Sequence, residues 1–561
     1  MKNITHIISA KTIYITGFIL LLFTACRKVN TDTEVNLPRN FTPGQISISA
    51  GETDVILSWA PSFFTAGKNV SYTIEVSKDL SFTTIDYTQV VDTSTITITD
   101  ADLDVRQPYY ARVKANAFNN TAESGWVVSA EFQITGEQIF YPILDVELKD
   151  VSVVLRWKAT TGLTKIVVTP DAGGTPISVN LDAADLSNLY KLISGLTAQT
   201  AYTAEIYRNN TSKGYISFTT KTTTVFTLTL NPGDDIVTAV ANAADGDVIG
   251  LNPGVYNAVD GGGVFQNLTV SGKTITIASV SDNPANTKVN YKEITLKGDG
   301  AGLTLKGLEF DGAPSSASGQ SALYFLNLTG LSSDGQAAVF TDILVENCMV
   351  HDMGNTFMRG NRGSSNGAHK INSIRIKNSF VYNSAQINTN YSFFQINKLQ
   401  FGTLEVLNST LYSIGRAFVD WDANFTVSPQ PVINIEQTTI NNMGLANMSY
   451  ILFDANANDV LITLKNSIVG NSPYPGESVS SLIRATGAQI SFENSNYFNL
   501  MDGATPTPAP LEIPSNVVLT NNLMIDPGWT AGTTSFTLPA GSPLRTASTT
   551  GGPIGDPRWA F

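Results

Sequence analysis

The sequence predicts an all-β chain in which two small β-sandwiches precede a right-handed parallel β-helix. Only 14% of the 561 residues are charged, against about 25% in a typical soluble protein. Residues 43–223 hold short alternating segments separated by turns, and residues 343–497 repeat one apolar pattern about every 30 residues. These observations favour sheets and turns over long helical bundles.

Charge and cysteine content exclude several classes of protein. The chain has 34 basic and 47 acidic residues, a formal net charge of −13. Nucleic acid is not expected as a partner, because its binding needs a basic surface. Two cysteines, Cys26 and Cys348, are too few for a disulfide framework or a cysteine zinc cluster. The apolar content of 42% excludes wholesale disorder.

The N-terminus is typical of an export signal. Lys2 and Lys11 precede an apolar run over residues 13–23, which is too short to span a bilayer comfortably. Small residues then lead to Cys26, and residues 23–26 resemble a bacterial lipobox in which Phe replaces the usual Leu. The resemblance implies a signal peptide over residues 1–25, acylation of Cys26 and a polar tether over residues 26–42. We therefore expect a cell-envelope lipoprotein of the outer membrane, exposed at the surface, with an ordinary secretory signal as the alternative.

Residues 43–136 predict the first sandwich. Alternating segments at residues 55–59, 72–76 and 95–99 read as strands. Trp59 in an early strand, and Leu103 with Tyr109 before a later one, resemble the core tryptophan and the tyrosine corner of fibronectin type III domains.

Residues 137–223 repeat this plan. Trp157 ends an early strand, and Leu196 and Tyr202 match the corner. Both segments thus resemble fibronectin type III domains, and we expect spacers between the lipid anchor and the larger module rather than recognition domains.

Residues 224–561 predict the β-helix. The segment 234–256, DDIVTAVANAADGDVIGLNPGVY, resembles the N-terminal cap and first coil of the pectate-lyase-like superfamily, which implies the pectin lyase fold. Further on, five consecutive spacings of 31, 30, 29, 29 and 28 residues separate a column of turn residues, Asn347, Asn378, Asn408, Gln437, Asn466 and Asn494. Positions two and four residues before each member are apolar, so one strand per coil stacks on the next.

The same alignment explains Cys348. The residue after each member of the column is Cys348 in the first coil and Ser or Thr in the others. We therefore predict a packed small residue rather than a nucleophile, for which His351 is the one histidine close in sequence.

The tail carries a further resemblance. Asp526-Pro527, Ser542-Pro543 and the segment 555–559 are similar to the ending of an uncharacterised family of Bacteroidota lipoproteins. Those proteins combine fibronectin type III domains with a pectate-lyase-like β-helix and sit in glycan-degradation loci. The resemblance implies a polysaccharide as partner, with an acidic, pectin-like glycan as the first candidate, and a chain that is expected to be monomeric and anchored to the membrane by lipid.

Candidate catalytic residues follow from the chemistry of uronate lyases. Such enzymes neutralise a carboxylate and then remove a proton from carbon, which requires basic side chains. Arg359, Arg362, His369 and Lys370 form the densest basic group and lie in a Gly/Ser/Asn-rich insertion. The alternative is an ordinary solvated loop.

Later coils offer residues for binding sugar and metal. Tyr391, Phe394, Arg416 and Trp421 are the predicted glycan-binding residues, with Trp421 stacking on a ring. Asp420 and Asp422 lie two apart on a predicted strand, so both project to one face and could hold Ca²⁺ or form a carboxylate pair. Asp454 and Asp459 are weaker candidates, and all four could instead be surface acids.

Complete catalytic motifs are missing. Residues 375–377 resemble one piece of the polygalacturonase signature, but the other pieces are absent. Two functions therefore stay open: a lipoprotein that binds a polysaccharide, and a polysaccharide lyase or glycoside hydrolase.

Overall fold

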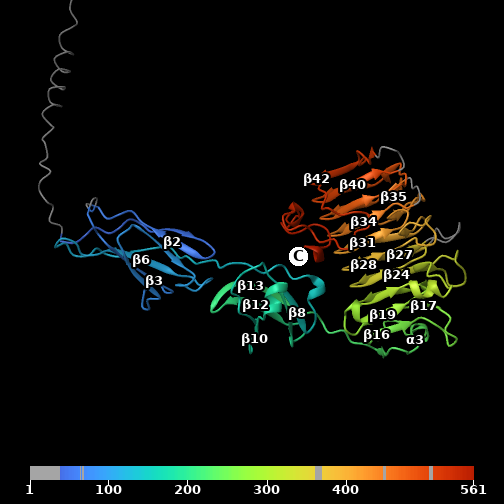
Figure 1. Ribbon diagram of the computed structural model, residues 1–561, viewed down its shortest axis with the longest axis horizontal. Coiled ribbons are helices and arrows are strands. Elements are labelled where there is room, and N and C mark those ends of the chain that lie inside the picture. Colours follow the sequence, from blue (N-terminus) through green and yellow to red (C-terminus); the bar gives the residue numbers. More distant parts are fainter. Residues whose placement is uncertain are drawn as a thin grey trace, which may run out of the picture. The chain divides into compact units, whose positions relative to one another are not determined.

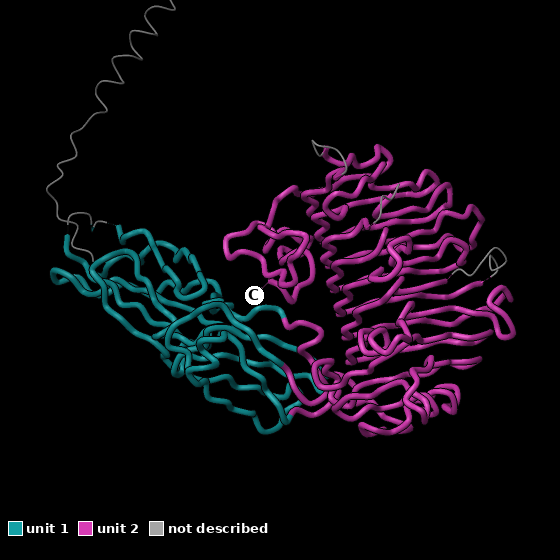
Figure 2. The backbone as a smooth tube through the Cα atoms, turned by 45° about the vertical axis from the view of Figure 1, so that its right-hand side comes forward, with its two compact units in different colours: residues 1–142, 154–195, 200–220 teal, residues 143–153, 196–199, 221–561 magenta. Residues whose placement is uncertain are grey.

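The computed structural model describes residues 38–560 except 64, 66–67, 361–368, 446–449 and 504–508 (Figure 1). By its internal contacts the chain divides into two compact units (Figure 2). The first comprises residues 1–142, 154–195 and 200–220, and the second comprises residues 143–153, 196–199 and 221–561.

The first sandwich packs a three-stranded sheet, order β1-β2-β5, on a four-stranded sheet, order β4-β3-β6-β7. Trp59 is 5% exposed in its core, and the hydroxyl of Tyr109 accepts a hydrogen bond from the Asp104 N–H at 3.1 Å, which forms the predicted tyrosine corner. The strands are β1 (Ser47–Ala50), β2 (Asp54–Ser58), β3 (Tyr72–Ser77), β4 (Tyr87–Val91), β5 (Thr95–Thr99), β6 (Tyr110–Ala115) and β7 (Val127–Val128).

The second sandwich has sheets of order β10-β9-β12-β13 and β11-β8. Trp157 is fully buried, and a bridge to Phe140 adds a further pairing at the edge. Its elements are β8 (Ser152–Arg156), β9 (Lys165–Pro170), β10 (Ile177–Asn180), α2 (Ala183–Asn188), β11 (Tyr190–Ser194), β12 (Ala201–Arg208) and β13 (Thr211–Thr219).

Three sheets form the walls of the β-helix, and most successive strands of the chain enter different sheets. The first sheet contains β14 (Leu228–Leu230), β15 (Val248–Leu251), β18 (Thr274–Ser279), β21 (Gly302–Lys306), β24 (Val339–Glu346), β27 (Lys370–Lys377), β30 (Gln400–Leu407), β33 (Val432–Glu436), β36 (Leu461–Lys465), β39 (Gln489–Glu493) and β42 (Val517–Thr520). The second sheet contains β16 (Gly254–Asn257), β19 (Thr287–Asn290), β22 (Glu309–Asp311), β25 (Met349–His351), β28 (Phe380–Tyr382), β31 (Thr410–Ile414), β34 (Thr439–Met443), β37 (Ile468–Ser472), β40 (Asn496–Asp502) and β41 (Ala509–Pro510). The third sheet contains β17 (Asn267–Ser271), β20 (Glu293–Lys297), β23 (Tyr324–Thr329), β26 (Thr356–Arg359), β29 (Phe394–Gln395), β32 (Val419–Asp420), β35 (Tyr450–Asn456) and β38 (Ser481–Ala485). All pairs are parallel except β40 with β41, which confirms the all-β prediction of two fibronectin type III-like sandwiches and a parallel β-helix.

The asparagine column lies at the turn from the first sheet to the second. Its six members, five asparagines and Gln437, all have positive φ, between 46° and 54°. Asparagine tolerates this left-handed backbone better than most residues, which explains its recurrence at this point of each coil.

The residue after each asparagine forms a ladder. The Ser379 hydroxyl accepts from the Cys348 N–H at 3.1 Å, and the Ser409 hydroxyl accepts from the Ser379 N–H at the same distance. Cys348 is 1% exposed and its thiol contacts the Glu346 carbonyl at 3.3 Å. Burial raises the pKa of the Cys348 thiol to about 12, so Cys348 is a packed residue rather than a nucleophile.

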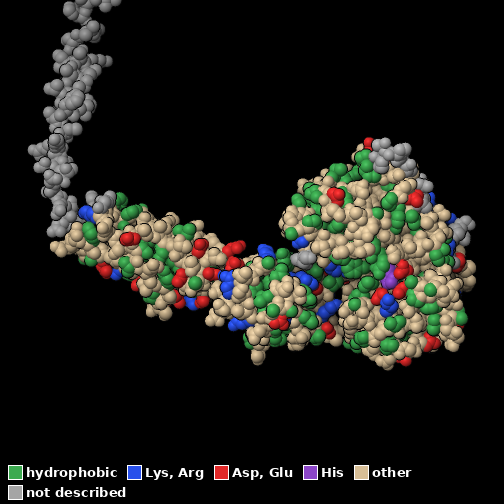
Figure 3. Space-filling view, viewed as in Figure 1, with side chains coloured by type: hydrophobic (Ala, Val, Ile, Leu, Met, Phe, Trp, Pro, Cys, Tyr) green, Lys and Arg blue, Asp and Glu red, His purple; other side chains and the backbone are tan. Residues whose placement is uncertain are grey.

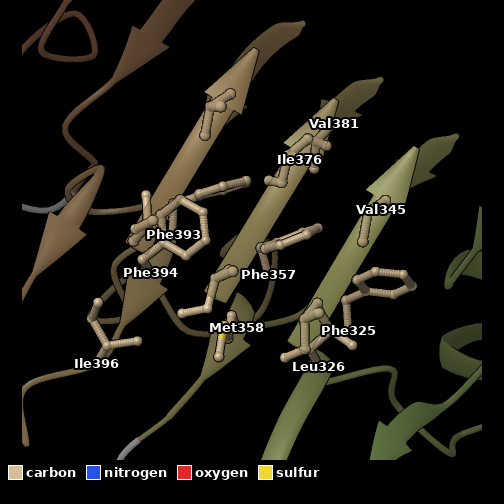
Figure 4. Packing of buried hydrophobic residues seen from close by; sticks show 14 of the residues in the cluster. Phe325, Leu326, Val345, Phe357, Met358, Ile376, Val381, Phe393, Phe394 and Ile396 are labelled. Carbon is tan, nitrogen blue, oxygen red and sulfur yellow. The ribbon is translucent and has the colours of Figure 1, made fainter. Parts of the chain in front are cut away.

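Apolar columns fill the interior. Ile343, Ile374 and Leu404 are neighbours in register in the first sheet and are at most 1% exposed. Behind the third sheet, an aromatic stack continues from coil to coil (Figure 4). The Phe357 ring lies 5.2 Å from that of Phe325 and 4.8 Å from that of Phe393.

The N-terminal end of the β-helix core is covered by a helix. Helix α3 (Ile236–Asn242) buries Ile236 and Val240 against the first coils, and the Asp235 side chain caps it by accepting from the Thr238 N–H at 2.9 Å. The short helix α4 (Ala313–Ala317) follows β22.

The C-terminal segment, residues 522–560, packs on the outward side of the second sheet and is red in Figure 1. Arg558 donates to the carbonyls of Asn378 and Ser379 at 2.9 and 3.0 Å, and Trp559 donates to the Thr410 hydroxyl at 2.7 Å. Among the described residues, no helix is long and apolar enough to cross a membrane.

Candidate functional site

A continuous polar row runs along the outward face of the third sheet. Its members are consecutive neighbours in register, and their flanking residues in each strand point into the core. We call this set the polar row: Thr269, Thr295, Asn327, Arg359, Gln395, Asp420, Asp454 and Arg484. A hollow of about 320 Å³ lies over its first members and is also lined by Glu293 and Lys297.

The centre of the polar row is a network of amides and carboxylates. The Gln395 amide donates to Asp420 Oδ2 at 2.9 Å. The Asn397 amide donates to both Asp420 Oδ1, at 2.8 Å, and Asp422 Oδ1, at 2.5 Å. The Asn397 amide nitrogen therefore lies between the carboxylates of Asp420 and Asp422. Binding of Ca²⁺ by these two carboxylates stays a prediction.

Asp420 is an unusual carboxyl group. It is 6% exposed, and burial, with the nearby charges of Asp422 and Asp454, raises its pKa to about 6. The hydrogen bond from Gln395 and the charge of Arg416 oppose this rise. The Asp420 carboxyl group is therefore expected to ionise near pH 6.

Asp454 is the neighbour of Asp420 on the next strand and has a basic partner. Arg484 donates to its two oxygens through Nε and Nη2, both at 2.8 Å, so Asp454 is a partnered carboxylate. The Arg484 guanidinium also lies 4.7 Å from the centre of the Tyr450 ring.

Aromatic and basic groups border the network. The Arg359 guanidinium lies 4.9 Å from the centre of the Tyr324 ring, which contacts the Tyr391 ring edge-on at 5.9 Å. Arg416 follows in the next coil, and its Nε is buried with no hydrogen-bond partner in the described part of the chain.

Several predicted residues lie elsewhere. Trp421 and Phe394 are both fully buried, and the Trp421 indole donates to the Leu399 carbonyl at 2.8 Å, so neither ring can stack on a sugar. Asp420 points outward, and in a strand the next residue must point inward. Asp459 is exposed at a turn and accepts from Gln430 at 2.5 Å.

The predicted basic group is divided. Arg359 lies in the third sheet, whereas Lys370 begins β27 in the first sheet and is exposed. His369 is fully buried, accepts from the Ala338 N–H at 3.2 Å and has its pKa lowered by burial, so it is a neutral core residue rather than a surface base. Arg362 and Cys26 lie outside the described residues.

Sequence reasoning missed Gln395, Asn397, Tyr324 and Arg484. The signal that identifies Gln395 and Arg484 is register across the third sheet, which the varying lengths of the connecting segments conceal in the sequence.

Residues 254–414 match a family model described as a domain of unknown function, DUF4957. The matched stretch begins at β16 and ends at β31, and its description names no activity. No curated protein matches the chain.

Solved structures resemble the chain in part. The FN1–FN3 domains of chicken CNTN1 are 13% identical, cover 33% of this chain and 69% of their own, and give a TM-score of 0.16. A two-domain fibronectin type III segment of chicken tenascin is 17% identical, covers 32% of this chain and 99% of its own, and gives a TM-score of 0.18.

Proposed function

We propose that this chain is a cell-envelope lipoprotein whose β-helix binds an acidic, pectin-like polysaccharide along the polar row. The observation that carries the proposal is the register of the row, which places polar side chains in eight successive coils of one sheet. Coils repeat every ~4.8 Å, so a row of this length suits an extended polymer better than a small molecule.

The side chains suit a uronate glycan. Arg359 and Arg416 offer guanidinium groups for a sugar carboxylate, and the buried Nε of Arg416 has no partner in the described structure. Asp422, Gln395 and Asn397 can exchange hydrogen bonds with sugar hydroxyls. Tyr391, which is half-buried beside Tyr324, offers a ring surface.

In the proposal, the parts of the chain that precede the β-helix hold it at the cell surface. In the proposal, acylated Cys26 anchors the protein to the outer membrane and the two sandwiches act as a spacer. Contacts between the sandwiches support this role: Lys213, 5% exposed, binds Asp100 at 3.0 Å and Glu137 at 2.5 Å. Labelling with a radioactive fatty acid tests the anchor, because Cys26→Ala should abolish the label.

Electrophoresis through gels containing pectate, alginate, chondroitin sulfate or neutral xylan tests the binding function. We expect retardation by pectate and little by xylan. Tyr391→Ala should relieve the retardation, whereas Tyr215→Ala, a matched change of an exposed tyrosine in the second sandwich, should not. Equal retardation of both variants would contradict the proposed site.

Hydrolysis is the second candidate function, and Asp420 favours it. A carboxyl with a pKa of about 6 beside a carboxylate held by Arg484 resembles the acid and base that glycoside hydrolysis needs. New reducing ends without ultraviolet absorbance would indicate hydrolysis, and absorbance from unsaturated uronate would indicate a lyase. If neither signal appears and the retardation is retained, the chain binds the glycan without cleaving it.

A further inference from the structure

A second cluster of ionisable side chains lies on the outward face of the second sheet. Glu309 and Asp311 belong to β22, and His351 follows Asp311 in register on β25. Their ligand atoms all lie within 4.8 Å of one another. His351 is 6% exposed, and the Glu309 and Asp311 side chains are 15% and 13% exposed. Acidic, basic and histidine side chains gather at one place on this face of the β-helix in Figure 3.

The His351 ring is held in one orientation. Its Nδ1 lies 2.7 Å from Asp352 Oδ2, and the other oxygen of Asp352 accepts from the Asn383 amide at 3.0 Å. The Tyr382 ring stacks on the His351 ring, with the ring centres 4.8 Å apart and an interplanar angle of 4°. A carboxylate on one ring nitrogen leaves the other available as a ligand, and Nε2 lies 3.2 Å from Glu309 Oε1.

A cation already occupies the space between the two acids. The Lys288 ammonium lies 2.6 Å from Glu309 Oε1 and 3.2 Å from Asp311 Oδ2. The Lys288 side chain is 34% exposed and flexible, so the ammonium can move to solvent without disturbing the strand that carries it.

We propose that Glu309, Asp311 and His351 bind one divalent first-row transition ion, which displaces the Lys288 ammonium. One imidazole nitrogen and two carboxylate oxygens are ligands that Zn²⁺ accepts, with a water in the fourth position. Ligands at ~2.0–2.1 Å in a tetrahedron are about 3.4 Å apart, close to the separation of His351 Nε2 and Glu309 Oε1.

Charge also balances in the exchange. Glu309, Asp311 and Asp352 present three carboxyl groups around one place, and the Lys288 ammonium brings one positive charge to them. A divalent ion brings two, so it can replace the ammonium without loss of positive charge. Ca²⁺ should compete poorly, because hard cations prefer oxygen-only sites.

This site is separate from the polar row, which lies on the third sheet, and its ion would join two successive coils. The proposal therefore does not depend on polysaccharide binding. Its test is a calorimetric titration of the full chain, purified without a histidine tag, with Zn²⁺.

Two variants should change affinity in opposite directions. His351→Gln removes the nitrogen ligand and should weaken Zn²⁺ binding at least tenfold, whereas Lys288→Met removes the competing ammonium and should strengthen it at least tenfold. Glu405→Gln, which removes an acid that binds Arg375 in the first sheet, should leave affinity unchanged. A matching rise in melting temperature with Zn²⁺, absent in His351→Gln, is also expected.

Equal Zn²⁺ affinity of the wild type, His351→Gln and Lys288→Met would overturn the proposal, as would failure of both the wild type and Lys288→Met to bind. If His351→Gln does not fold, Glu309→Gln replaces it with the same expected loss. Replacement of Zn²⁺ by Co²⁺ adds a visible spectrum, which should show a four-coordinate nitrogen and oxygen site and disappear in the ligand variants.

Discussion

Arg484 donates two hydrogen bonds of 2.8 Å to the Asp454 carboxylate, and the two residues lie on the last two strands of the third sheet. Asp454 is 4% exposed, so this contact supplies the partner that a buried charge requires. The pair thereby places a hydrogen-bonded carboxyl group directly beside Asp420, whose pKa is raised to about 6.

Loss of Arg484 should therefore destabilise the β-helix. Arg484→Met leaves a buried carboxylate without its main donor, and we expect a loss of about 1–3 kcal/mol in the free energy of unfolding. The double variant Asp454→Asn/Arg484→Met should recover part of that loss in a thermal or urea melt. A double variant less stable than Arg484→Met alone would contradict the role assigned to this pair.

Asp420 should make stability depend on pH. The carboxyl ionises near 3.8 in the unfolded chain and at about 6 in the folded one, so the folded state binds the proton more tightly. The contribution of Asp420 to wild-type stability should therefore fall as pH rises from about 4 to about 6 and then level off. Asp420→Asn cannot ionise, and its stability relative to wild type should rise over this interval by at most about 3 kcal/mol.

Melting curves of both proteins from pH 4 to 8 measure this difference. Asp459→Asn, an exposed acid in the same part of the chain, is the matched control and should show no such trend. A constant difference between Asp420→Asn and wild type over the whole range would rule out the raised pKa.

Trp421 should matter for stability rather than for glycan binding. Trp421→Phe keeps most of the buried ring but leaves the Leu399 carbonyl without its indole donor, so the melting temperature should fall by the equivalent of about 1–3 kcal/mol. Pectate affinity of the folded variant should change less than twofold. Reduced affinity at an unchanged melting temperature would restore Trp421 as a sugar platform.

The position of Cys348 should tolerate replacement by serine. Four of the five equivalent residues in later coils are Ser379, Ser409, Ser467 and Ser495, and each is fully buried. Cys348→Ser should therefore change the free energy of unfolding by less than about 1 kcal/mol, whereas Cys348→Phe overpacks the ladder and should cost about 1–3 kcal/mol or more. Urea denaturation distinguishes the two outcomes, and a large loss in Cys348→Ser would contradict the ladder.

The first sheet could be predicted from the sequence because its coils are nearly equal in length. Spacings from Asn347 to Asn494 vary only between 31 and 28 residues, so apolar positions align by counting. Strand alternation and the left-handed turn at each asparagine then follow from backbone chemistry.

The polar row could not be predicted in this way. Its members from Arg359 to Arg484 are separated by 36, 25, 34 and 30 residues, because connecting segments of different length precede each short strand of the third sheet. Asp420 was predicted, but without knowledge of register its neighbour Trp421 was assigned to the same surface. His369 likewise follows an insertion whose polar composition suggested exposure, whereas its ring packs at 5.4 Å against Phe340.

The most direct test of the central claim compares two arginines on different sheets. Arg359→Met removes a guanidinium from the polar row, and Arg375→Met removes one from the first sheet, where Arg375 binds Glu405. We predict that the dissociation constant for pectate oligosaccharides, measured by calorimetry, rises at least tenfold in Arg359→Met and less than twofold in Arg375→Met. Equal affinities of the two variants, or a larger loss in Arg375→Met, would contradict polysaccharide binding along the third sheet.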